Sequence, residues 1–255
     1  MLAIRSKFTL FPGRRAARSV CLFALFGVYA SAGVVTFTSE DLNAGPGNPH
    51  PNADTAATSF ATAAGAIGNI GLITFESVPV GNFTNLVVAP GVTIRGADGS
   101  GNNLFINNTP DFPVAPALDG FNTTPGGANY VEVKGGTLTF TFATPIQFFS
   151  AILTGVQTNF FQDTVTFNDG SSQSINAPGT GTNSSNGALD FVGFTDAGKS
   201  ITSVSINAGT ASQDFIGVDD VRFQTGVPEP SPVWFVLTGC VVLALGLRRY
   251  GTGRG

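Results

Sequence analysis

Two acidic residues stand side by side near the end of the chain, in the run GVDDVRF at residues 217–223. The apolar residues around Asp219 and Asp220 indicate the last strand, and this segment carries two carboxylates next to each other in sequence. Hard cations such as Ca²⁺ bind carboxylate and carbonyl oxygens. The pair therefore predicts a structural Ca²⁺ site. The alternative is that one of these carboxylates forms an ion pair with Arg222 or caps a turn.

A second oxygen-rich run, DGSGNN at residues 98–103, carries oxygen-bearing side chains at alternate positions. An EF-hand loop needs glycine at its sixth place and glutamate at its twelfth. Counted from Asp98, these places hold Asn103 and Thr109. The run is therefore interpreted as a turn.

Catalytic motifs are missing from the sequence. His50, the only histidine, stands between two prolines, and both cysteines, Cys21 and Cys240, lie in apolar segments at the chain ends. A Ser-His-Asp triad would have to use His50, and a zinc site would lack a second histidine. Glycoside hydrolysis needs two carboxylates across a sugar bond, and no compact motif frames Glu76 or Glu132 for that task. The chain is predicted not to be an enzyme, and a glycoside hydrolase is the least favoured function.

Charge is distributed unevenly. Of 12 basic residues, five lie before residue 19 and three after residue 247. Residues 33–227 keep four basic and 15 acidic residues, a formal charge of −11. An acidic body repels phosphate backbones, which argues against nucleic-acid binding.

Strand patterns dominate the chain from residue 72 onward. In GTLTFTF the apolar side chains alternate with threonines, which is typical of a sheet with one face in water. Asn168-Asp169-Gly170 predicts a hairpin turn, because Asp-Gly tolerates positive φ. Many strands without helices between them predict an all-β fold, an antiparallel β-sandwich or jelly roll. The predicted strands lie at 72–76, 91–96, 136–142, 160–168, 190–194, 200–206 and 215–223.

An alanine-rich segment at residues 53–68 predicts a short N-terminal helix with Asp54 as its cap. We expect residues 33–70 to form an arm that carries this helix and residues 71–226 to form the sandwich. Residues 1–32 are expected to be a signal peptide, and residues 227–255 a sorting signal with a transmembrane helix.

The N-terminal signal has three parts. Residues 1–18 are basic, residues 20–30 are apolar, and Ala30-Ser31-Ala32 forms a small-residue cleavage site. This order is typical of a secretory signal peptide that is cut before Gly33. The alternative, an uncleaved anchor, is disfavoured because the apolar run is short for a bilayer core of about 30 Å.

The C-terminal segment begins with a proline-rich motif, continues with an apolar run at residues 233–247, and ends with an arginine pair. Arginines after an apolar run keep that end in the cytoplasm. The segment closely resembles the PEP-CTERM sorting signal. The residues that carry the resemblance are Val227, Pro228, Glu229, Pro230, Arg248 and Arg249. An ordinary tail anchor is the alternative.

The PEP-CTERM resemblance implies a location and a partner. Proteins of this family are sent to the envelope of Gram-negative, exopolysaccharide-producing bacteria, and an exosortase is thought to process them. It implies that this chain is exported, is anchored in the membrane only before processing, and ends at the cell surface or outside the cell. The primary interpretation is therefore a non-enzymatic envelope or extracellular protein that is associated with exopolysaccharide or biofilm matrix.

A looser resemblance supports an alternative function. The ending around Asp219 and Asp220 resembles that of carbohydrate-binding jelly rolls, in which the last strand and an acid near the first strand share a structural Ca²⁺. In this chain Glu76 would be that acid. The alternative function is thus a carbohydrate-binding module with structural calcium. Asparagines in loops could hydrogen-bond sugars, although the only tryptophan, Trp234, lies in the tail; these asparagines are Asn102, Asn103, Asn107 and Asn108.

Overall fold

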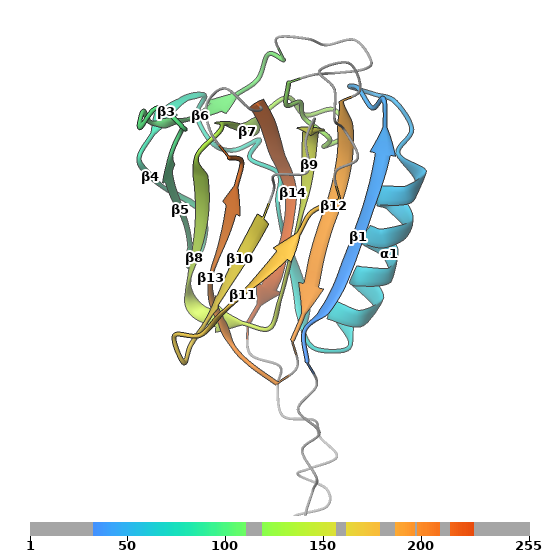
Figure 1. Cartoon of the computed structure of the whole chain (residues 1–255), viewed down its shortest axis with the longest axis vertical. Helices are drawn as coiled ribbons and strands as arrows, with labels where there is room; N and C mark the ends of the chain where they lie inside the picture. Colours follow the sequence, from blue (N-terminus) through green and yellow to red (C-terminus); the bar gives the residue numbers. More distant parts are fainter. Residues whose placement is uncertain are drawn as a thin grey trace, which may run out of the picture. The chain divides into compact units, whose positions relative to one another are not determined.

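The computed structural model describes residues 33–110, 119–156, 162–178, 187–196, 198–209 and 215–226. These residues form two antiparallel sheets packed face to face, with one helix on the outside of the larger sheet (Figure 1). The predicted antiparallel β-sandwich with a short helix is confirmed. The signal peptide and the C-terminal sorting signal lie outside the described residues. Within those ranges, no helix has the length and apolar character needed to cross a bilayer.

The larger sheet has eight strands. Seven of them follow the order β1-β12-β9-β14-β7-β6-β3, and β2 pairs with β14. β14 pairs with β7 at Phe215 and Ile216 and with β2 from Val221 to Thr225. It therefore changes partner along one edge, between Ile216 and Val221. The strands are β1 Val35–Leu42, β2 Asn69–Ile73, β3 Gly81–Phe83, β6 Leu104–Asn107, β7 Tyr130–Lys134, β9 Phe148–Val156, β12 Ala188–Thr195 and β14 Phe215–Thr225.

The smaller sheet has six strands in the order β11-β10-β13-β8-β5-β4. In β8, Leu138, Phe140 and Phe142 are buried, whereas the threonines between them are partly or fully exposed. This is the predicted sheet with one face in water. The turn that contains Gly170, at φ 81°, joins β10 to β11 as the Asp-Gly signal predicts. The strands are β4 Asn85–Ala89, β5 Val92–Ala97, β8 Thr137–Ile146, β10 Gln162–Phe167, β11 Ser172–Asn176 and β13 Ile201–Asn207.

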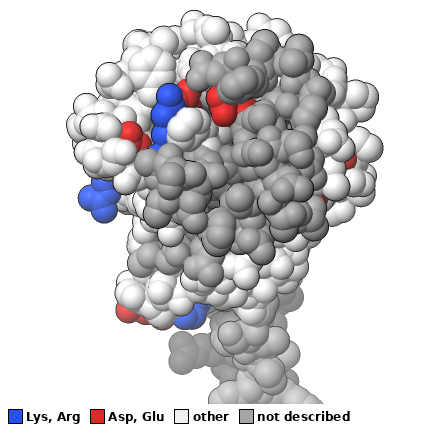
Figure 2. Space-filling view, turned by 45° about the horizontal axis from the view of Figure 1, so that its top comes forward, with Lys and Arg blue, Asp and Glu red and all other residues white. Residues whose placement is uncertain are grey.

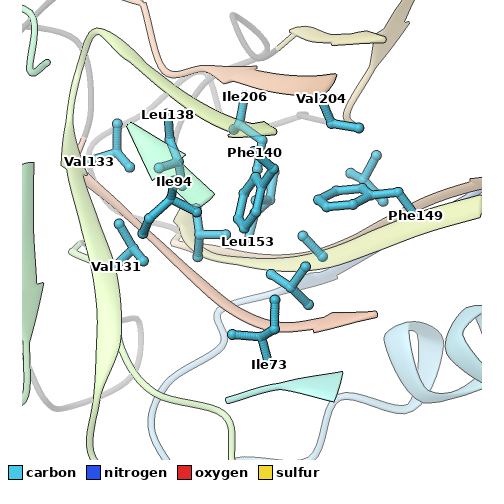
Figure 3. Close-up of a cluster of buried hydrophobic side chains, with 14 of the residues drawn as sticks. Ile73, Ile94, Val131, Val133, Leu138, Phe140, Phe149, Leu153, Val204 and Ile206 are labelled. Atoms are coloured by element: carbon cyan, nitrogen blue, oxygen red, sulfur yellow. The ribbon is translucent and has the colours of Figure 1, made fainter. Parts of the chain in front are cut away.

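The space between the sheets is filled by aliphatic and phenylalanine side chains (Figure 3). Phe140 of the smaller sheet and Phe149 of the larger one are both fully buried, with ring centroids 5.2 Å apart. Because side chains alternate along a strand, every second residue of the larger sheet points out of this core. The outward residues form the face on which the helix and the candidate sites lie.

Helix α1, Pro51–Gly65, begins before the predicted cap Asp54. The Asp41 carboxylate of β1 accepts hydrogen bonds from the backbone N–H groups of Asn52 and Ala53 at 3.2 and 2.8 Å. A helix start needs acceptors for its free N–H groups, and here the neighbouring strand supplies them. The prediction of Asp54 as the cap is therefore wrong.

Residues 33–70 contribute to the sandwich itself. β1 is an outer strand of the larger sheet, paired with β12 from Val35 to Leu42, and α1 covers the outer face beside it (Figure 1). Phe60 of α1 is fully buried in a second cluster outside the sheet, together with Phe148, Ile152 and Phe191. This segment is predicted to form an arm ahead of the first strand; in the structure it supplies β1, the covering helix α1 and the start of β2.

Candidate functional site

Asp219 and Asp220 lie where β14 changes partner from β7 to β2. The pairing of β14 with β9 shifts register between Asp219 and Arg222, and Asp220 has φ 46°. A positive φ is uncommon for a residue with a side chain, and aspartate is among those that tolerate it best. The irregularity leaves a gap between β2 and β7 along this edge, and the loop at residues 121–129 lies there.

The Asp219 carboxylate holds the first part of this loop. Its Oδ2 atom accepts hydrogen bonds from the backbone N–H groups of Thr123 and Thr124, at 2.8 and 3.2 Å. The hydroxyls of the same threonines donate to Asp220 at 3.0 and 2.9 Å. Neither carboxylate forms an ion pair with Arg222. Of the two alternatives to a cation site, the structure supports the capped turn.

Glu76 follows β2 and holds the other end of the same loop. It accepts hydrogen bonds from the backbone N–H groups of Ala128 and Asn129 and from the Asn122 side chain, the last at 2.8 Å. The three carboxylates predicted to share a Ca²⁺ thus bind one loop from two sides. In the described part of the chain, no group of three or more His, Cys, Asp or Glu residues is placed to hold a metal ion.

Asp219 nevertheless keeps an unused ligand atom. Its side chain is fully buried, and its Oδ1 atom has no hydrogen-bond partner among the described residues. Burial raises the pKa of Asp219 to about 7, against the hydrogen bond from the Thr123 N–H, and the nearby Asp220 charge raises it further. A buried oxygen of this kind fits a proton or a cation. Asp219, Asp220 and the two threonine hydroxyls are the oxygens available for a cation here.

A second site lies on the outer face of β3, β6 and β7, toward the upper left of the sandwich in Figure 1. Phe105 stands at its centre. In the paired strands it lies opposite Asn82 on one side and Glu132 on the other. Its neighbours Leu104 and Ile106 are buried in the core, so the Phe105 ring points outward, where it is half-buried.

Polar side chains surround Phe105 in a cavity of about 300 Å³. Glu132 binds Lys134 at 2.8 Å through one oxygen and the Asn107 amide through the other. The amide side chains of Asn82 and Asn103 are exposed on either side. Cavities of about 300 to 1,000 Å³ with a few placed polar groups are typical of small-molecule sites. Besides Leu104, the cavity is lined by Asn82, Asp98, Asn102, Asn103, Phe105, Asn107, Glu132 and Lys134.

Two carboxylates line this cavity, but both are engaged. Asp98 accepts hydrogen bonds from the N–H groups of Ser100 and Asn102 at 2.9 and 2.7 Å, which is the turn predicted from the sequence. Hydrogen bonds from Asn102 hold the pKa of Asp98 below its ordinary value. A glycosidase acid needs a raised pKa. Asp98 therefore lacks the property that a hydrolytic acid requires, whereas the cavity as a whole suits binding.

The asparagines at 102–108 are predicted as loop residues, and no predicted site includes Phe105 or Asn82. The signal was present in the alternation Asn103, Phe105 and Asn107, which places all three on one face of a short strand. His50, the only histidine, lies at the start of α1, with Nδ1 3.1 Å from the Asp54 carboxylate.

Comparisons give only distant likenesses. The chain matches no protein-family model and no curated protein sequence. It is similar to the K2 cleaved adhesin domain of Lys-gingipain, with a TM-score of 0.38 and 16% identity, covering 62% of this chain and 98% of that one. It is also similar to a family 29 carbohydrate-binding module from Piromyces equi, with a TM-score of 0.30 and 10% identity. That match covers 63% of this chain and 92% of the module. The match to CBM35 from Cellvibrio japonicus Abf62 has a TM-score of 0.29 and 14% identity, and it covers 62% of this chain and 95% of that one. Similarity at this level assigns neither family nor ligand to this chain.

Proposed function

We propose that this protein is an exported, non-enzymatic envelope protein that binds polysaccharide on the outer face of β3, β6 and β7. The observation that supports it is the outward Phe105 ring set among exposed amides and the Glu132–Lys134 pair. A sugar ring has an apolar face of C–H groups and a rim of hydroxyls. An aromatic side chain covers the first, and amide, carboxylate and ammonium groups hydrogen-bond the second.

Replacing Phe105 by alanine should weaken polysaccharide binding about twofold to tenfold, because an aromatic contact contributes roughly 0.5–1.5 kcal/mol. The measurement is retention of the purified full chain on immobilised neutral polysaccharides, with Asn82→Ala as a second variant in the same site. Asn85→Ala, an exposed amide of the other sheet, is the matched control. Equal retention of Phe105→Ala and the unchanged protein would remove this face as the binding site.

The same proposal includes the sorting route. Its support is the linear order of VPEP, the apolar run and the arginine pair, preceded at the other end by a signal peptide. Proline and the residue before it disfavour helix, so VPEP is expected to be an extended peptide at the membrane surface, open to a processing enzyme.

Changing Pro228, Glu229 and Pro230 together to alanine should leave the protein in the membrane with its tail attached. The measurement is the intact mass of the surface protein from hosts with and without their exosortase. If the protein still carries Trp234 to Arg249 in both hosts, the tail is an ordinary anchor and no exosortase acts on it.

A structural Ca²⁺ at Asp219 and Asp220 completes the proposal. An ion that binds only the folded state, present at 100 times its dissociation constant, adds about 2.7 kcal/mol to the free energy of unfolding. The melting temperature of the full chain should therefore rise on going from chelator to excess CaCl₂, and Asp220→Asn should reduce the rise. A melting temperature unchanged by calcium would reject the site.

A further inference from the structure

A second cavity, of about 510 Å³, lies at the same end of the sandwich as the Phe105 cavity. Its walls come from three segments: the loop between β1 and α1, the chain just after β6, and the loop at residues 121–128. The last of these is the loop that Asp219 and Glu76 hold from its two sides. This cavity therefore has a fixed wall, and none of its lining residues belongs to the Phe105 cavity.

Consecutive residues connect the two cavities. Asn107 lines the Phe105 cavity, and Asn108 lines the second one. Between them the Asn107 side chain accepts hydrogen bonds from the N–H groups of Asn108 and Thr109, at 2.8 and 3.0 Å. The turn at Asn107–Thr109 therefore forms the rim between the two cavities, and the exposed Asn108 side chain lies on this rim.

The charge of the two linings favours a neutral ligand. Among the described residues that line the second cavity, none is Asp, Glu, Lys or Arg, and His50 is the one ionisable side chain. The Phe105 cavity holds two carboxylates, Asp98 and Glu132, against one ammonium, Lys134. On the described surface in Figure 2, blue and red side chains stand as separate small patches among uncharged residues. A polyanion would meet repulsion at the first cavity, and the described lining of the second offers it no Lys or Arg.

We infer that the two cavities form one extended site for several consecutive units of a neutral polysaccharide, running from Phe105 across the Asn107–Asn108 turn to the second cavity. The inference rests on the proposed function and deepens it, because it specifies a chain segment rather than a single terminal sugar. Amides on the rim and on the far wall, Asn108 and Asn48, are exposed and suited to hydrogen-bond sugar hydroxyls.

The test uses the purified full chain and oligosaccharides of one to six units, prepared by partial acid hydrolysis of the neutral polysaccharide that it retains best. Affinity should rise with length beyond two units. Asn48→Ala and Asn108→Ala should each weaken binding of the longest oligosaccharide about threefold to tenfold, as expected for one lost hydrogen bond, and leave the shortest binders unchanged. Phe105→Ala should weaken all lengths, and the control Asn85→Ala none.

The outcomes separate the two proposals. If Phe105→Ala weakens binding but affinity stops rising at two units and the Asn48 and Asn108 variants bind normally, the extended site is wrong and the Phe105 site stands. Stronger retention of a polyuronate than of any neutral polysaccharide would also overturn the extended neutral site. If no polysaccharide is retained at all, both proposals fail.

Discussion

Replacing Phe60 by alanine should lower the free energy of unfolding by about 3–5 kcal/mol. Phe60 is fully buried between α1 and the larger sheet, with edge-on contacts to Phe37, Phe148 and Phe191 at centroid distances of 5.8, 6.0 and 5.8 Å. Its removal leaves a cavity that the two surrounding strands cannot close, because β9 and β12 are paired on both sides. The measurement is urea unfolding of the purified chain followed by circular dichroism.

Leu72→Ala is the control for this prediction. Leu72 is a large apolar residue of the same sheet but is 54% exposed, so its replacement should change the free energy of unfolding by only about 0.5 kcal/mol. If Phe60→Ala costs less than about 1 kcal/mol, α1 does not pack on the sheet in solution and residues 33–70 form the detached arm that the sequence suggests.

The stability of the calcium-free protein should fall as pH rises from about 4 to about 7. The folded state raises the pKa of Asp219 to about 7 from 3.8, chiefly through burial, so over this range the folded chain keeps a proton that the unfolded chain has released. Stability decreases with pH wherever the folded state binds more protons, and each pKa unit is worth about 1.4 kcal/mol. The full loss from this one group is about 4 kcal/mol, reached near pH 7 and constant above it.

Asp219→Asn should remove most of this pH dependence, because the amide imitates the neutral acid and keeps an acceptor for the Thr123 N–H. The variant should be more stable than the unchanged protein at pH 8 and close to it at pH 4. Asp220→Asn should shrink the effect only in part, since the Asp220 charge is a smaller cause of the shift than burial. Urea unfolding in chelator at several pH values measures all three. Parallel pH profiles for Asp219→Asn and the unchanged protein would contradict the prediction.

Calcium gives this experiment a second use. A bound cation needs the deprotonated carboxylate, so CaCl₂ should restore stability above pH 7 and have little effect near pH 4. Asp219→Asn should lose that response while remaining the more stable protein in chelator. The pH dependence of stability and the gain in stability with CaCl₂ are thus both tested at Asp219, but in separate measurements, one in chelator and one with calcium.

β8, with one face in water, was predicted from the sequence, whereas β9, with both faces covered, was not, although the equally buried β12 was. The alternation of Leu138, Phe140 and Phe142 with threonines marks β8 directly. β9 reads FFSAILTGV and is buried at every position, since the core covers one face and α1 the other. A strand buried on both faces loses its period of two, so its sequence does not show which residues point where.

The proposed sorting signals can be predicted from sequence alone for a physical reason. A signal peptide and an apolar segment with flanking arginines act as linear segments, and their charge and hydropathy need no tertiary partner. The expected localisation of this protein, including processing at VPEP, therefore rests on residues 1–32 and 227–255 alone.

The sites required the fold. Asp219 and Asp220 could be chosen from sequence because they are adjacent, yet their partners, Thr123 and Thr124, lie some hundred residues away and meet them only because β14 changes strand partner there. The binding surface proposed around Phe105 forms only through pairing with β3 and β7, which place Asn82 and Glu132 beside it. Local sequence determines strand pattern and carries the predicted export signals, whereas long-range strand pairing decides which side chains share a cavity. Hydrogen-bonded register is set between segments distant in the chain.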